Sequence, residues 1–340
     1  MKIDVTLAID DLGDVPGIAR AAEALGFDGL WTAETRHEPF LPLALAAEHT
    51  RRVSLGTAIA VAFPRSPTVV AHTAWDLQAA SGGRVILGLG TQVKGHIERR
   101  FSVKWTAPGP RLREYIQALR AIWGAWQARS PVNFRGEHYA VTLMTPFFAP
   151  GPIEHPQIPI YIAAVNPYNL RLAGEICDGV HLHPFHSVKY LREFALPHVE
   201  SGLARGSRPR EALALAASVF MVTGRDREEM RRAREHARTQ IAFYASTRTY
   251  EPVLAAHGWQ DLTPRLHRKS VDGDWAGMAA LVTDEMLEVF AVEAPLDGLR
   301  AALDERYRGL LDRVAPYVAL DRRTTAEELR VFATALRAGS

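Results

Sequence analysis

The chain has 340 residues, which is enough for one large α/β domain or two ordinary ones. Hydrophobic residues make up 47% and charged residues 23%, an ordinary composition for a globular enzyme, and the formal net charge of +2 gives no electrostatic case for a nucleic-acid partner. The single cysteine, Cys177, excludes an intramolecular disulfide framework and favours a reducing compartment. The N-terminus lacks the apolar core of a signal peptide, and every apolar run is too short to span a membrane. We therefore expect a cytoplasmic protein without membrane partners.

The first fifty residues alternate between apolar runs and helical patterns. A strand is predicted at residues 3–9, and the following helix ends at Gly26. A second strand is predicted at residues 28–32, followed by a polar loop at 34–38 and a further helix up to His49. This order is typical of β/α units.

Residues 53–92 form the most informative stretch. The run from 53 to 63 shows almost no polar alternation, which is typical of a strand covered on both faces in a parallel sheet. Ser66 and Pro67 predict the start of a helix, as a cap and a first-position proline. A second apolar run follows at 85–89. Because chemistry in parallel α/β folds sits at the carboxyl ends of strands, we expect the active site beside these two runs.

Proline, glycine and aromatic residues crowd residues 128–157, a segment too long for a simple connection. We expect an insertion with a hairpin over one end of the fold. Its Phe147 and Phe148 have two interpretations, as a roof over a flat ring or as packing against the body of the protein. Strand and helix patterns then resume, with strands predicted at 158–164, 178–183, 214–222 and 313–318, one helix at 188–203 and a second, helical insertion at 250–290.

Seven or eight strands alternating with helices, the eighth a candidate at 313–318, favour a single (β/α)₈ TIM barrel over residues 1–340, with two insertions, rather than a doubly wound sheet. An open dinucleotide-binding sheet is disfavoured because no G-x-G-x-x-G motif follows the first strand.

Several segments, taken in order, resemble one known family. These are DGLWTAE after the second strand, LGTAIAVAFPRSP at the third, ILGLGTQ at the fourth, IPIYIAAVNP and AGEICDGVHLHPF. Together they are similar to the bacterial luciferase-like monooxygenases and hydride transferases, and most similar to the branch that uses the deazaflavin coenzyme F420. The resemblance covers residues 3 to about 225.

The resemblance implies where a coenzyme would lie. It implies a bulge in the third strand, with a non-proline cis peptide between Ala58 and Ile59, that supports one face of a tricyclic ring. It places the end of the fourth strand beside the ring and a later loop at the phosphate, while the basic residues Lys94, His96, Arg99 and Arg100 would meet an anionic tail. The implied coenzyme-binding residues are Ala58, Ile59, Val61, Gly90, Thr91, Gln92, Ala163, Ala164 and Asn166.

The catalytic candidates follow the second strand. Glu34 is placed where carboxylates in barrels are often catalytic, but a capping or salt-bridging role beside Arg36 is an equal interpretation. Related enzymes often carry an acid–histidine pair here, whereas this chain has Thr35 at the histidine position. His37, two residues later, is the alternative proton carrier, and a solvated loop histidine is the simpler interpretation of it.

His181 and His183 have a spacing that would place both rings on one face of a strand, as in some metal sites. Structural or substrate-facing histidines are favoured, because neighbouring strand ends supply no further ligands. We thus expect an oxidoreductase that transfers a hydride between F420 and a small organic substrate, in a homodimer or larger homo-oligomer. The alternatives are an FMN-dependent monooxygenase, a metal-dependent hydrolase using His181 and His183, and a flavin-binding protein without turnover.

Overall fold

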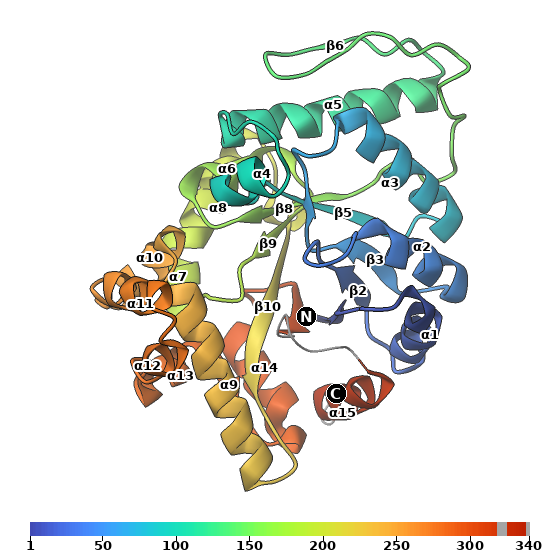
Figure 1. Ribbon diagram of the computed structural model, residues 1–340. Coiled ribbons are helices and arrows are strands. Elements are labelled where there is room, and N and C mark those ends of the chain that lie inside the picture. Colours follow the sequence, from blue (N-terminus) through green and yellow to red (C-terminus); the bar gives the residue numbers. More distant parts are fainter. Residues whose placement is uncertain (318–324, 338–340) are drawn as a thin grey trace.

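The computed structural model describes residues 1–317 and 325–337. Eight parallel strands close into a barrel with helices around it (Figure 1), and their order around the barrel follows their order in the chain. Closure comes from the last strand pairing with the first, in the register Lys2 with Arg313 and Ile3 with Val314. Strands are present at all eight predicted places: β1 (Lys2–Leu7), β2 (Gly29–Thr32), β3 (Ser54–Thr57), β5 (Val85–Gly90), β8 (Ile160–Ala164), β9 (Gly179–Leu182), β10 (Ala214–Val222) and β12 (Arg313–Pro316). The run predicted at 53–63 is divided between β3 and a separate short strand, and residue 318 of the predicted last strand lies outside the described residues.

Two short strands extend this barrel. β4 (Ala60–Val61) continues the line of β3 and pairs with β5, while β11 (Ala291–Glu293) pairs with the end of β10 beyond the point where β12 pairs. The first of them matters for function, because it holds the chain immediately after β3 against the carboxyl end of β5.

A buried ion pair lies inside the barrel. The Arg313 guanidinium donates to both carboxylate oxygens of Asp4, each at 2.7 Å, and the indole of Trp31 donates to the same carboxylate at 2.9 Å. Gly29 makes room for this pair, since a Cβ there would lie 2.5 Å from the Arg313 guanidinium. The interior below the mouth is therefore filled and holds β1, β2 and β12 together.

Helices surround the strands: α1 (Val15–Ala24), α2 (Phe40–His49), α3 (Pro67–Ser81), α4 (Lys94–Arg99), α5 (Pro108–Ala128), α6 (Pro167–Ile176), α9 (Arg227–Ala245), α14 (Leu299–Tyr307) and α15 (Ala326–Arg337), the last of which packs on α1 and α14. The predicted start of α3 is confirmed, because Ser66 accepts a hydrogen bond from the Val69 amide. The helix ends at Gly82, whose φ of 65° is the left-handed conformation that glycine favours. Of the described helices, none combines the length and apolar character needed to cross a bilayer.

The helix predicted at 188–203 is confirmed as a continuous helical run, but it contains a π-helical turn that the sequence did not indicate. The structure has a short α7 (Val188–Tyr190), a π-helical turn (Leu191–Ala195) and then α8 (Leu196–Arg205). The Leu196 amide bonds five residues back, to the Leu191 carbonyl. Pro197 follows directly and has no N–H to continue an α-helical ladder, which accounts for the change of hydrogen-bond pattern here.

Both predicted insertions have structure of their own. Residues 128–157 contain a hairpin of β6 (Phe134–Arg135) and β7 (Ala140–Val141), which lies along α5 (Figure 1). The Glu114 carboxylate on α5 anchors it by accepting the amides of residues 137–139 at 2.8–3.1 Å. The second segment forms α10 (Glu251–Ala255), α11 (Leu262–Val271), α12 (Trp275–Ala279) and α13 (Asp284–Phe290), packed around α9.

Candidate active site

A bulge interrupts the third barrel strand at its carboxyl end. The Ala58–Ile59 peptide bond is cis, which confirms the conformation that the family resemblance implied. The loop after β2 brackets this bulge, since the Ala58 amide donates to the Thr32 carbonyl at 2.6 Å and the Glu34 amide donates to the Ile59 carbonyl at 3.1 Å. The bulge is thus held by backbone contacts on both sides of its cis bond.

The Glu34 carboxylate also helps to hold the bulge in place. One of its oxygens, Oε2, accepts the Val61 amide at 2.7 Å and the Arg65 guanidinium at 2.7 Å. Only 7% of the Glu34 side chain is exposed, and Arg65 also contacts Glu38 at 3.2 Å. The geometry therefore gives Glu34 a clear supporting role at the bulge, whereas its proposed catalytic role stays a prediction.

Three segments that the resemblance assigned to the coenzyme meet beside the bulge. A Cβ at Gly90 would lie 2.6 Å from the Ile59 side chain and 3.6 Å from the Cβ of Ala163. The carboxyl ends of β3, β5 and β8 therefore come together around small side chains. The backbone of Gln92, just beyond, is left-handed with φ of 58°, and its side chain accepts the Val93 amide.

The remaining predicted coenzyme residues lie on the same rim. Asn166 caps α6 by accepting the Asn169 amide at 2.9 Å, so its side chain is already engaged in ending the loop after β8. Arg100 lies just after α4 and donates to the Thr35 carbonyl, and its guanidinium stacks over Phe101. Phe147 and Phe148 are 89% and 63% exposed and line no part of the pocket at the barrel mouth, so the structure does not support their interpretation as a roof.

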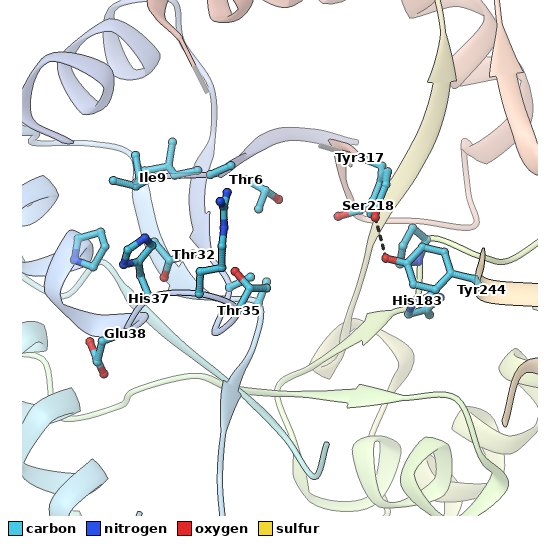
Figure 2. Close-up of a pocket in the computed structure, with 17 residues that line it drawn as sticks. Thr6, Ile9, Thr32, Thr35, His37, Glu38, His183, Ser218, Tyr244 and Tyr317 are labelled. Carbon is cyan, nitrogen blue, oxygen red and sulfur yellow. Dashed lines mark hydrogen bonds between the residues drawn. The ribbon is translucent and has the colours of Figure 1, made fainter. Parts of the chain in front are cut away.

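A pocket of about 240 Å³ opens at the mouth of the barrel, next to the bulge. The carboxyl ends of β1, β2, β9, β10 and β12 line it together with Ala58, and Tyr244 of α9 closes one side. Figure 2 shows two groups of polar side chains facing each other: Thr35, His37 and Glu38 on one side, and His183, Ser218 and Tyr244 on the other.

The first wall contains one of the two predicted catalytic residues. His37 lines the pocket with 56% of its side chain exposed, and its Nε2 lies 3.8 Å from the Asp10 carboxylate. Arg36 pairs with the same carboxylate at 3.1 Å. His37 is therefore accessible to a ligand in the pocket, whereas Glu34 is not among the lining residues.

The second wall is aromatic and hydroxyl-bearing. The half-buried His183 ring stacks on Tyr250 at 4.2 Å and meets Tyr244 edge-on at 4.5 Å. Burial lowers the pKa of His183 to about 3, so its imidazole is neutral at ordinary pH. The Tyr244 and Tyr317 hydroxyls lie 2.6 Å apart, which ties α9 to the end of β12.

Sequence reasoning missed most of this second wall. Ser218 carried a usable signal, because it is the only polar side chain in the nine-residue strand ALAASVFMV. Tyr244 and Tyr317 carried none, since they come from a charged outer helix and the last strand, and only the closed barrel brings them together.

His181 lies one layer deeper than His183. It packs edge-on against Trp31 at 4.9 Å and beside Tyr161 at 5.3 Å, and burial lowers its pKa to about 3. Within residues 1–317 and 325–337, the only three potential ligands gathered closely enough for a metal ion are Glu114, Glu137 and His138, far from this strand in the fold. His181 and His183 thus lack the third ligand that a hydrolytic metal site needs.

Comparison with known proteins agrees with this arrangement. The family model described as luciferase-like monooxygenase matches residues 3–313. An uncharacterized protein of Mycobacterium tuberculosis is 50% identical over 311 residues, which are 89% of this chain and 92% of the relative. An F420-dependent glucose-6-phosphate dehydrogenase of Intrasporangium calvum is 32% identical over 224 residues, covering 60% of this chain and 64% of the relative.

A solved structure has the same fold. It is the coenzyme F420-dependent tetrahydromethanopterin reductase of Methanopyrus kandleri, which superposes with a TM-score of 0.79 over 98% of this chain and 97% of the other, at 21% identity. The family match covers the chain from β1 to the first residue of β12 and all the pocket-lining residues except Tyr317. The chain belongs to the luciferase-like monooxygenase family.

Proposed function

We propose that this chain is an oxidoreductase that transfers a hydride between coenzyme F420 and a small organic substrate. The observation that carries the proposal is the meeting of the Ala58–Ile59 bulge with Gly90 and Ala163 beside the pocket. Small side chains at this point let a planar ring approach the backbone closely. The F420-dependent relative at 32% identity supports the choice of coenzyme.

The site has the features that such a coenzyme needs. A pocket of about 240 Å³ is below the usual range of roughly 300–1,000 Å³ for ligand pockets, so it suits a ring or a small substrate rather than a whole coenzyme with its tail. Gly90 supports this fit, because any side chain there would press on Ile59 and fill the approach to the bulge. The exposed Lys94, Arg99 and Arg100 lie on the segment after β5, where an anionic tail would leave.

Different residues of the chain would support the bulge, exchange a proton and bind a phosphate group. F420 carries the hydride when it is bound. His37, exposed in the pocket wall, would exchange the proton that accompanies the hydride, and Glu34 would hold the bulge in place through Val61 and Arg65. The α6 N-terminus, capped by Asn166, would take a phosphate group.

The second candidate is an FMN-dependent monooxygenase on the same scaffold, which the description of the matching family favours. Titration of the purified protein with each coenzyme separates the two. F420 is followed by its fluorescence and FMN by flavin fluorescence, at equal concentrations and salt. Saturable F420 binding at one equivalent per chain with weak FMN binding is expected, whereas FMN binding without F420 binding would reject the proposal.

A further inference from the structure

Two polar side chains in the pocket wall have unused hydrogen-bonding capacity. Across the part of the chain that the structure describes, neither Nε2 of His183 nor the Ser218 hydroxyl has a hydrogen-bond partner. Both line the pocket, and Figure 2 shows them on the same side of it, beside Tyr244. Both atoms face the pocket, so a ligand that enters it can become their hydrogen-bond partner.

The hydrogen on His183 is positioned by the backbone. The Phe185 amide donates to Nδ1 of His183 at 3.1 Å, so Nδ1 carries a lone pair and the hydrogen of the neutral ring is on Nε2. Stacking on Tyr250 and the edge contact with Tyr244 hold the ring in this orientation. His183 therefore presents a fixed N–H donor, and the adjacent Ser218 hydroxyl donates or accepts as needed.

The charges of the two walls define the kind of ligand group that fits. Ser218, Tyr244 and Tyr317 are uncharged beside the neutral His183. The charged lining residues, Arg36 and Glu38, lie on the wall formed by the loop after β2. An anionic group beside His183 would be desolvated without a cation, while an uncharged oxygen would accept the Nε2 hydrogen bond.

We propose that His183 and Ser218 form the substrate-binding wall and select an uncharged oxygen, such as a carbonyl, as the group placed against it. Naming that group as part of the substrate rests on the proposed function. The ring carbonyl of a bound deazaflavin has the same chemistry, so the test separates the two sources.

The test uses the full-length protein without coenzyme and three probes of similar size. Cyclohexanone supplies an uncharged oxygen, cyclohexanecarboxylate an anionic one, and methylcyclohexane none; dissociation constants are measured by ligand-observed NMR. His183→Phe keeps the ring contacts and removes the donor, and Ser218→Ala is a smaller change should the first variant fail to fold. His198→Phe is the matched control, since His198 is a half-buried histidine with an edge contact to Phe194 on the outer α8.

The expected result is that cyclohexanone binds more tightly than either other probe, and that His183→Phe and Ser218→Ala each weaken it about 2- to 10-fold. The control variant should bind as the wild type does. The ¹⁵N signal of His183 Nε2 should shift on addition of cyclohexanone while Nδ1 stays bonded to Phe185.

Three results would overturn the assignment: tighter binding of the carboxylate, equal binding of cyclohexanone and methylcyclohexane, or an unchanged cyclohexanone constant in both variants. A separate titration of His183→Phe with F420 distinguishes the sources. If that variant loses F420 affinity about 2- to 10-fold, the oxygen belongs to the coenzyme and the substrate assignment is wrong. If the wild type does not bind F420 but still binds cyclohexanone through His183, the proposed function is wrong, while the assignment of His183 and Ser218 as a binding site for an uncharged oxygen is supported.

Discussion

Replacing Glu34 with glutamine separates a supporting role from a catalytic one. The substitution keeps the shape of the side chain but removes the charge that accepts both the Val61 amide and the Arg65 guanidinium at 2.7 Å. Hydrogen bonds to a charged group contribute roughly 1.5–3 kcal/mol, and Arg65 keeps its contact with Glu38. We therefore expect Glu34→Gln to lower the free energy of unfolding by about 2 kcal/mol.

Glu34→Gln should also weaken the binding of the coenzyme. Val61 lies just after the bulge, so a weaker hydrogen bond between its amide and residue 34 should let the bulge shift. We expect F420 affinity to fall about tenfold, which corresponds to about 1.4 kcal/mol. Urea unfolding and F420 fluorescence titration measure the two effects. Glu228→Gln is the control, since Glu228 pairs with Arg231 on the exposed face of α9 and neither quantity should change.

A double-mutant cycle then tests whether the two side chains act together. If Glu34 works through Arg65, the Arg65→Gln variant should show the same two losses, and the double variant should lose little more than either single one. The reasoning is refuted if Glu34→Gln unfolds and binds F420 like the wild type but loses turnover and the acidic limb of its pH–rate profile. That combination would make Glu34 the proton carrier.

Three further predictions follow from other parts of the barrel. Gly90→Val should weaken F420 binding by at least about tenfold in a fluorescence titration, because its Cβ would lie 2.6 Å from Ile59; an unchanged affinity would place the ring elsewhere. Asp4→Asn should lower the free energy of unfolding by about 3–5 kcal/mol in urea, since it leaves the Arg313 charge buried without its partner, and a loss below about 1 kcal/mol would contradict this. His186 is buried a few residues after β9, and burial lowers its pKa to about 4, so only the unfolded state takes up its proton as the pH falls below about 6.5; this one group should lower the free energy of unfolding by about 2 kcal/mol between pH 8 and pH 5, and His186→Phe should remove that part of the pH dependence.

The strands and the helix start were predictable because their signals are local. The run from 53 to 63 lacks polar alternation since helices cover the outer face of β3 and the packed barrel interior covers its inner face, and Ser66 with Pro67 marks the first turn of α3 by its own chemistry. The cis bond at Ala58 has no such signal in the residues themselves. It was predicted only through the family resemblance and is now described directly.

The candidate site was predictable in place but not in detail. A position after β2 puts Glu34 near the mouth of any barrel, yet the direction of its carboxylate depends on Arg65, which comes from 31 residues further along the chain. The second pocket wall depends on closure, because Tyr244 and Tyr317 are 73 residues apart and meet only when α9 packs over the end of β12. Sequence position therefore identified the end of the barrel, while tertiary contacts decided which side chains face the pocket.

A crystal structure of the protein with F420 tests the central claim most directly. The account predicts the deazaflavin ring against the Ala58–Ile59 bulge, with its edge beside Gly90 and the pocket wall of His183 left for a second ligand. A ring bound away from the bulge, or one that reaches His183 and fills the whole pocket, would contradict it.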